Sequence, residues 1–301
     1  MNNSNKILLN AAIIFTAAGV LLGLADITSG KDELLGVGNM AFETRSYDIN
    51  ERFSDISIED IECSINIQRS SDNRCRVICP AKTDGSVYRT AKVDNGVLRI
   101  ERHDNGKLFS LFNFPSAELE VYLPEGEYGK LTAYSSSGKI SVDEGFTFEN
   151  VRLESVSGSI EMCSDVQDEL RAESTGGSVT VESASPEKLT AKSKSGRVAL
   201  SHIRSDDISA SSVSGRIELC DVIAASRLSA ESVSGSVELD GCDADKMKLE
   251  STSGSVKGTL LSGKTFTAHS VSGSVDVPFS ASGGDCEIST TSGSIRIEID
   301  R

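Results

Sequence analysis

The sequence LSAESVSGSVEL, residues 228–239, contains the unit that decides the fold of this chain. Its glycine is followed two residues later by Val or Ile and is preceded, in every copy but one, by serine. The unit occurs nine times, at a spacing of 19 or 20 residues, with its glycine at Gly138, Gly158, Gly177, Gly196, Gly215, Gly235, Gly254, Gly273 and Gly293. Such a constant spacing is typical of repeat architectures, in which each unit packs against its neighbours.

Apolar residues alternate with polar ones on both sides of each glycine. In the quoted unit, Leu228 and Ala230 precede the glycine, and Val237 and Leu239 follow it. Alternation with period two predicts two short strands per unit, each with one buried face. The alternation changes phase at the glycine, which predicts a corner there, because glycine adopts backbone angles that other residues avoid. We therefore predict an all-β fold, a β-solenoid (β-helix) of about nine coils, with each coil directly on its predecessor.

Two serine columns flank the corner. Positions are counted from the glycine. Position −3 is serine in eight units and Thr290 in the last. Position −1 is serine in every unit except that of Gly177, where Gly176 takes its place. The alternation places both columns on the inward face, where stacked hydroxyls could hydrogen-bond to one another in ladders. The alternative is a row of catalytic serines. A nucleophilic serine needs a neighbouring base, and the chain has three scattered histidines, so we favour the structural role.

Position −2 should face outward and carries mostly β-branched residues. This column is our candidate interaction stripe, and the alternative is that its residues reflect only high β-propensity. Its members are Val156, Thr175, Val213, Val233, Thr252, Val271 and Thr291.

Acidic residues recur at positions −4 and +3, for example at Glu231 and Glu238. They predict either a solvated face that keeps the sheet soluble or a carboxylate stripe that binds cations or cleaves polysaccharides. We favour the solvated face, because Lys192 and His269 interrupt the stripe. The chain has no C-x-x-C pair and only three scattered histidines, so we expect no metal site. The few histidines also lead us to expect no catalytic residues, and we expect no cofactor. With 45 acidic and 30 basic residues, it is a poor partner for nucleic acid.

The N-terminal segment is apolar. Residues 7–25 contain no charge, and about 19 residues of helix span nearly the hydrocarbon thickness of a bilayer. Lys6 precedes the segment and Asp26 follows it, which predicts a single-pass anchor with residues 1–6 in the cytoplasm and the body outside. A cleaved signal peptide is the alternative, although this segment is longer than a usual signal core. We expect a linker at 26–42, a β region at 43–124 and the solenoid repeats at 125–301.

The β region at 43–124 should cap the N-terminal end of the solenoid, where an open edge would invite aggregation. Its pattern predicts a hairpin in which Ile65 faces Val77, and this register places Cys63 opposite Cys79 as a candidate disulfide. The apolar segment Leu108–Phe114 would plug the solenoid end or pack on a neighbouring surface. Seven cysteines are an odd number, so at least one thiol is unpaired or bridges to another chain.

The Ser-x-Ser-Gly-Ser-Val copies, the strand at Phe114–Pro124 and the single N-terminal anchor resemble the "putative-adhesin" family of bacterial membrane-anchored β-strand-repeat proteins. The resemblance covers roughly Ser57 to the C-terminus. It implies an envelope-associated structural or adhesive protein, and some relatives are associated with envelope-stress responses. The family has no catalytic residues to carry over, and seven cysteines are more than the resemblance leads us to expect.

We therefore expect a non-enzymatic protein of the cell membrane whose extracytoplasmic solenoid binds or scaffolds an envelope glycan or protein. One alternative is a polysaccharide-active solenoid enzyme, which would gather Asp, Glu, Lys or Arg in one concave groove. Another is a self-assembling envelope scaffold, with rods joined end to end through Ile295, Ile297 and Ile299 of the last coil.

Overall fold

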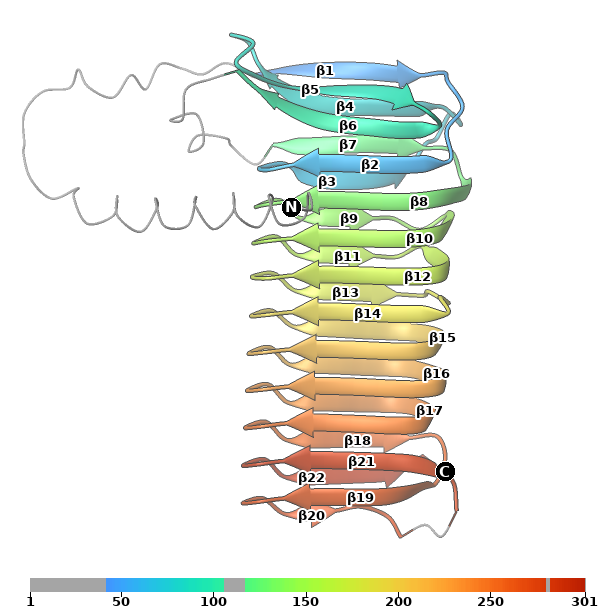
Figure 1. The fold of residues 1–301 in the computed structure, drawn as a ribbon, viewed down its shortest axis with the longest axis vertical. Coiled ribbons are helices and arrows are strands. Elements are labelled where there is room, and N and C mark those ends of the chain that lie inside the picture. The colour runs from blue at the N-terminus through green and yellow to red at the C-terminus, as the bar shows by residue number, and fades with distance from the viewer. Residues whose placement is uncertain (1–41, 106–116, 280–281, 301) are drawn as a thin grey trace, which may run out of the picture. The chain divides into compact units, whose positions relative to one another are not determined.

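The computed structural model describes residues 42–105, 117–279 and 282–300, and these ranges contain β-strands and no helix. They form a β-solenoid of about eight turns (Figure 1). Within them, no helix has both the length and the apolar character needed to cross a bilayer. The predicted anchor at 7–25 and the predicted plug at Leu108–Phe114 lie outside the described residues. Residues 41–301 form one compact unit.

Each coil contributes a strand before the corner and a strand after it, and like strands stack in parallel. In the first coils these are β8 (Gly126–Ser135), β9 (Ile140–Val142), β10 (Phe146–Ser155), β11 (Ile160–Met162), β12 (Asp165–Ser174), β13 (Val179–Glu182) and β14 (Lys188–Ser193). In the next coils one strand continues around the far bend, giving β15 (Val198–Ser212), β16 (Ile217–Ser232) and β17 (Val237–Ser251). The register matches the repeat, since Leu189, Ile208 and Leu228 stand opposite one another and are buried. The predicted apolar columns therefore form the core.

The last two coils exchange places. They comprise β18 (Val256–Leu260), β19 (Lys264–Ser270), β20 (Val275–Asp276), β21 (Gly284–Thr290) and β22 (Ile295–Ile299). β21 pairs with both β17 and β19, and β22 pairs with both β18 and β20, so the C-terminal coil lies inside. The prediction that every coil lies on its predecessor is wrong here.

The exchange also changes which residues end the solenoid. Ile295 and Ile297, predicted to form the joining end, are buried, and Ile299 is half-buried. The coil that contains these isoleucines has the larger apolar set, and the inner place buries more of that surface. The end of the solenoid is formed instead by β19 and β20.

The N-terminal region closes the other end. It contains β1 (Phe42–Ile49), β2 (Asp55–Asp60), β3 (Ser64–Arg69), β4 (Cys75–Lys82), β5 (Val87–Asp94), β6 (Val97–Asp104) and β7 (Glu118–Leu123). β2 and β3 stack on β8 and β9, and β6 and β7 stack next, all in parallel. β1, β4 and β5 then add antiparallel strands, which end the parallel stack (Figure 1).

The predicted hairpin between β3 and β4 is wrong, because β7 lies between them. Ile65 faces Leu119, while Val77 faces Val121. β7 supplies Leu119, Val121 and Leu123, all fully buried, so its insertion adds apolar contacts on both sides.

The corner glycines are required by close approach of neighbouring backbones. A Cβ on Gly215 would overlap the carbonyl group of Gly196 in the adjacent coil, and the same holds at each of the nine corners. None of these nine glycines has a positive φ. The predicted location of the corner is thus confirmed, but the predicted reason, a turn that only glycine can adopt, is wrong.

The serines at position −3 hold consecutive corners together. The Ser232 hydroxyl donates to the Gly215 carbonyl at 3.1 Å and accepts from the Gly235 N–H at 3.0 Å. The same pair of bonds recurs along the solenoid, for example at Ser174 and Ser193. The column is inward as predicted, but each hydroxyl bonds to corner backbone rather than to another hydroxyl.

The serines at position −1 are exposed, contrary to prediction. Alternation breaks at the corner because the chain bends there, while the backbone still bonds along the stack, as in the 2.9 Å bond from the Ser234 N–H to the Val213 carbonyl. The exposed members are Ser137, Ser157, Ser195, Ser214, Ser234, Ser253, Ser272 and Ser292.

The first coil uses different residues at the same corner. Asp60 and Cys63 replace the serine and the glycine, and Asp60 Oδ1 accepts from the Cys63 N–H at 2.9 Å. Arg89 of β5 forms a fully buried ion pair with Asp60 at 2.7 Å. Burial alone raises the pKa of Asp60, but the hydrogen bonds and charge of Arg89 outweigh it, so the pKa lies below its ordinary value.

Candidate interaction surface

The candidate interaction stripe forms one column on the outside of the corner. Backbone bonds to neighbouring coils place Thr252 beside Val233, and Thr291 between Thr252 and Val271. Val213, Val233 and Val271 are 44%, 48% and 68% exposed, whereas Val156 is half-buried. The structure thus brings the predicted residues together, with the last two in exchanged order.

Lys194 belongs to the same column and interrupts the stripe between Thr175 and Val213. Lys194 was not among the predicted residues because the prediction used β-branched side chains, whereas every residue at position −2 lies in the column. The continuous uncharged part, which we call the C-terminal stripe, consists of Val213, Val233, Thr252, Thr291 and Val271.

A shallow groove of about 490 Å³ runs beside the C-terminal stripe. It forms because side chains at positions −2 and −4 point outward while those at −3 point inward. The wall opposite the stripe is built from Ser211, Glu231, Glu250, Ser289 and His269. The groove therefore combines an apolar and hydroxyl wall with a polar one, and it repeats at about 4.8 Å per coil.

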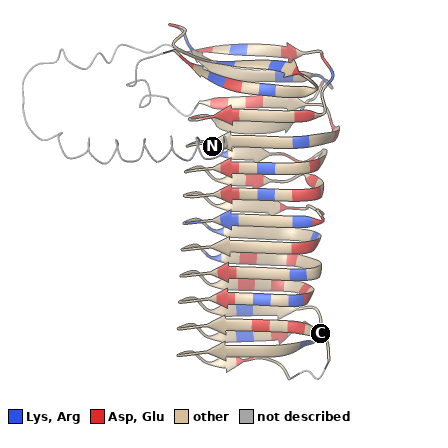
Figure 2. Ribbon diagram, in the orientation of Figure 1, with Lys and Arg blue, Asp and Glu red and all other residues tan. Residues whose placement is uncertain are grey.

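Cations pair with acidic residues on both faces of the solenoid. Lys248 Nζ lies 3.2 Å from Glu231 and 3.0 Å from Glu250, and hydrogen bonds from these carboxylates raise its pKa. Lys and Arg lie among Asp and Glu on many of the strands (Figure 2). No group of three or more His, Cys, Asp or Glu side chains in the described ranges could hold a metal ion. The ion pairs of Lys248 with Glu231 and Glu250 favour the solvated face over a cation-binding stripe.

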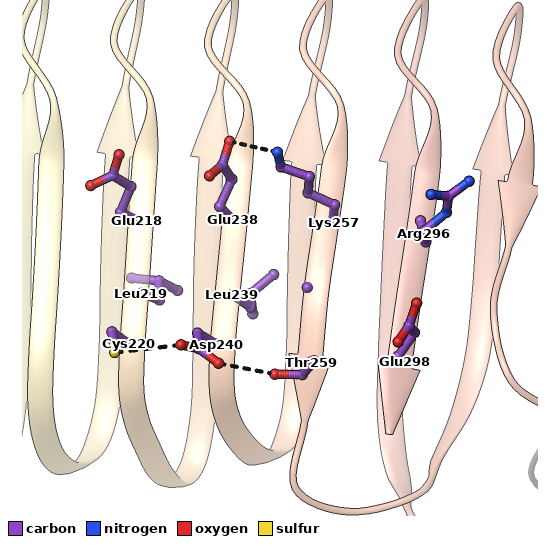
Figure 3. A pocket seen from close by; sticks show the side chains of 11 residues that line it. Glu218, Leu219, Cys220, Glu238, Leu239, Asp240, Lys257, Thr259, Arg296 and Glu298 are labelled. Carbon is purple, nitrogen blue, oxygen red and sulfur yellow. Dashed lines mark hydrogen bonds and ion pairs between the residues drawn. The ribbon is translucent and has the colours of Figure 1, made fainter. Parts of the chain in front are cut away.

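A second hollow lies on the other face of the solenoid, at Gly258 (Figure 3). Gly258 occupies an inward position that carries Leu219 and Leu239 in the two preceding coils. Its φ is +149°, and a Cβ would overlap the Leu239 carbonyl, so glycine is needed. The missing side chain leaves a cleft of about 400 Å³ floored by the two leucines. Glycine in an apolar column was the signal that could have predicted it.

Charged residues surround the Gly258 cleft. Glu238 is paired with Lys257 at 3.3 Å and with Arg216 at 3.5 Å. Asp240 accepts a hydrogen bond from Thr259 at 3.4 Å, and Figure 3 shows Arg296 and Glu298 on the far side. The rim therefore has both signs of charge around an apolar floor.

Comparison with known proteins places this architecture in a family. The family model described as Toastrack DUF4097 matches residues 53–220 and 184–301, most of the chain. The chain belongs to the Toastrack DUF4097 family. No curated relative matches this Toastrack chain significantly.

Solved structures similar to this Toastrack chain include a "putative adhesin" from Bacteroides fragilis NCTC 9343. It is 15% identical with a TM-score of 0.48, over 86% of this chain and 97% of that one. A "putative adhesin" from Parabacteroides merdae ATCC 43184 is 12% identical with a TM-score of 0.46, over 73% and 97%. A "putative lipid binding protein" from Parabacteroides distasonis ATCC 8503 is 21% identical with a TM-score of 0.38, over 85% and 96%. Similarity at this level says nothing about function.

The cysteines of this Toastrack chain are free thiols. Cys63 and Cys79 form the candidate disulfide. Cys63 directly precedes β3 and Cys79 lies in β4, and β7 lies between these two strands. The hairpin that suggested their pairing therefore does not form. Burial raises the pKa of Cys75 and Cys286 to about 12. Cys220 is exposed, with its Sγ 3.9 Å from an Asp240 oxygen.

Proposed function

We propose that this Toastrack protein is a non-enzymatic binding protein of the bacterial envelope, and that the C-terminal stripe contacts an envelope glycan or protein. The observation that carries the proposal is an exposed, uncharged row that continues through five coils beside a groove. In the neighbouring row, Glu231 and Glu250 are both paired with Lys248. The stripe thus offers apolar and hydroxyl contacts without first breaking a salt bridge.

The geometry of the stripe favours an extended ligand. Five positions at about 4.8 Å per coil extend about 19 Å, and each step presents a similar side chain. An extended polymer would therefore meet a repeated set of contacts. Each half-exposed valine offers about 1 kcal/mol or less on burial, so affinity would depend on several positions acting together.

We further propose that residues 7–25 anchor the protein in the membrane, with residues 1–6 in the cytoplasm and the solenoid outside. The support comes from the uncharged length of that segment and from Lys6 before it. Protease added to intact cells should digest an epitope tag placed at the C-terminus and spare one at the N-terminus. Protection of both tags would contradict this orientation.

The binding proposal is tested with residues 41–301 and purified envelope polymers, namely cell-wall polysaccharide and isolated envelope proteins. The variant Val233→Lys/Thr252→Lys puts two ammonium groups in the C-terminal stripe and should weaken binding at least tenfold. Thr180→Lys, on the outward row of β13, is the matched control and should leave binding unchanged. Equal binding by the stripe variant and the wild type would refute the role of the stripe.

A second candidate function is a polysaccharide-active enzyme at the Gly258 cleft, because Glu218, Glu238, Asp240, Lys257 and Arg296 converge there. Glycoside hydrolysis needs one carboxyl group that stays protonated. Glu238 is instead engaged in ion pairs with Lys257 and Arg216, and this engagement favours the binding protein over the enzyme. Release of reducing sugar from envelope polysaccharide by the wild type, and its loss in Glu238→Gln, would support the enzyme over the binding protein.

A further inference from the structure

The C-terminal end of the solenoid is an open sheet edge. In the described ranges, β19 pairs with β21 and β20 pairs with β22, and no strand lies beyond either. The outer edges of β19 and β20 therefore present backbone N–H and C=O groups to another strand. The inward side chains Phe266, Ala268 and Val277 are only half-buried, because no further coil covers them.

The β19 part of this edge lacks the charges that usually protect one, whereas β20 carries the exposed Asp276 and is followed by Pro278. The outward positions of β19 are Thr265, Thr267 and His269, and the strand is uncharged at its surface (Figure 2). The aligned strand β21 has Asp285 and Glu287 at the first two of these positions.

Two further observations indicate that the C-terminal end is unprotected: the one charged residue of β19 is buried, and apolar side chains are exposed nearby. Lys264 is buried, with its ammonium group bound to Asp243 and to the Ala244 carbonyl. Of the six large hydrophobic residues that are exposed in the described ranges, four lie in residues 261–279, namely Leu261, Val271, Val275 and Phe279. The end of the solenoid therefore combines an unprotected edge with apolar surface.

The opposite end of the solenoid does not offer a matching edge. There the parallel stack stops at β6 and β7, and the antiparallel strands β1, β4 and β5 cover it. The outermost of these, β1, carries ion pairs, including Asp48 with Arg76 at 3.1 Å. A head-to-tail polymer would have to join two unlike ends, so the remaining partner for the open end is the same end of a second copy.

We propose that two copies of this protein join tail to tail through β19. A two-fold axis that runs perpendicular to both sheets reverses the strand direction and keeps the core side inward. β19 then pairs antiparallel with β19 of the second copy. The sheet that contains β19 continues across the junction, and the interface closes at two copies.

The side chains fit this symmetry. With the axis at Thr267, Phe266 faces Ala268 of the second copy, so a large inward side chain meets a small one. Thr265 faces His269 of the second copy, so a hydroxyl group meets an imidazole and no like charges meet between the two β19 strands. The end of one solenoid is narrow, since seven residues of β19 extend about 23 Å and two packed sheets are about 10 Å apart. A small interface of this kind predicts a dissociation constant in the micromolar range.

Sedimentation of residues 41–301 from about 5 to about 500 μM tests the proposal. We expect a monomer–dimer equilibrium without larger species. Thr267→Lys/His269→Lys should weaken dimerisation at least tenfold, whereas Ser209→Lys, at the equivalent of Thr267 in an internal coil, should not. A monomer throughout the range, an open series of oligomers, or equal dimerisation by both lysine variants would overturn the proposal.

Cross-linking provides a second measurement that does not depend on destabilisation. Directly opposed residues of antiparallel strands have Cα atoms about 4.5–5.5 Å apart, within disulfide range. In a Cys220→Ser background, Thr267→Cys should form a disulfide-linked dimer on mild oxidation, and Ser209→Cys should not. Equal cross-linking of the two variants would exclude a two-fold axis at Thr267 and overturn the proposed register.

Discussion

The two serines that flank one corner should differ sharply in their contribution to stability. Ser212 is 5% exposed, and its hydroxyl donates to the Gly196 carbonyl at 3.1 Å and accepts from the Gly215 N–H at 2.9 Å. Ser212→Ala removes both bonds and leaves the Gly215 N–H without this acceptor. At about 1 kcal/mol per bond, with more for an unsatisfied buried group, the loss is about 2–3 kcal/mol. Ser214 is exposed, so Ser214→Ala should cost less than about 0.5 kcal/mol.

Native-state hydrogen exchange is the suitable assay, because a repeat protein opens locally and its coils depend on their nearest neighbours. A loss of about 2 kcal/mol should speed exchange of amides in residues 196–235 about 30-fold in Ser212→Ala, with little change in distant coils. Ser214→Ala is the matched control, since it removes the same hydroxyl group two residues away. If the two variants exchange at the same rate, the corner hydroxyl does not hold consecutive coils together.

Three other outcomes follow from the contacts. Gly215→Ala should cost about 3 kcal/mol or more, because the new Cβ meets the Gly196 carbonyl, and a urea midpoint equal to that of the wild type would contradict this. Iodoacetamide at pH 8 should modify Cys220 in the folded protein, whereas Cys75 and Cys286, buried and with pKa raised to about 12, should react only after unfolding, as mass spectrometry can establish. The folded pKa of Asp60 is lowered, so its contribution to stability is full above about pH 4 and is lost as the pH falls. Asp60→Asn should therefore destabilise the protein by about 3–5 kcal/mol at pH 7 and by less at pH 3, and an equal loss at both pH values, measured by urea unfolding, would be inconsistent with the ion pair.

The repeat columns were predictable because each depends on local alternation. Leu228, Ala230 and Val237 are buried as their positions indicate, since a strand with one buried face fixes which side chains point inward. The same rule fails at Ser234, where the chain bends and parity no longer reports direction. Position in the repeat thus predicts burial within strands but not at the corner.

Long-range order was not predictable from the same pattern. β21 and β19 have the same periodicity, so nothing local says which of them packs against β17. β7 likewise enters between β3 and β4 although it follows them by many residues. In both cases the outcome depends on total apolar burial, which a single unit does not encode.

The corner column also gives the solenoid a direction. At each corner the missing Cβ of glycine points toward the carbonyl group of the coil on the side of the N-terminal cap. Cys63 lies at the first corner and does carry a Cβ, which is tolerated because Arg89 and the cap strands, rather than another corner, lie beyond it. At the other end, the absent Cβ of Gly273 points toward the Gly293 carbonyl, which lies on the side of the cap. The close approach that requires glycine at Gly273 is therefore a contact within the chain and does not involve the open end. A strand added beyond β19 would meet no such steric constraint from this column, whereas β6, β7 and the antiparallel cap strands already occupy the place beyond the first coil, where the Asp60–Arg89 pair is buried. Association is therefore sterically permitted at the C-terminal end and opposed at the N-terminal end.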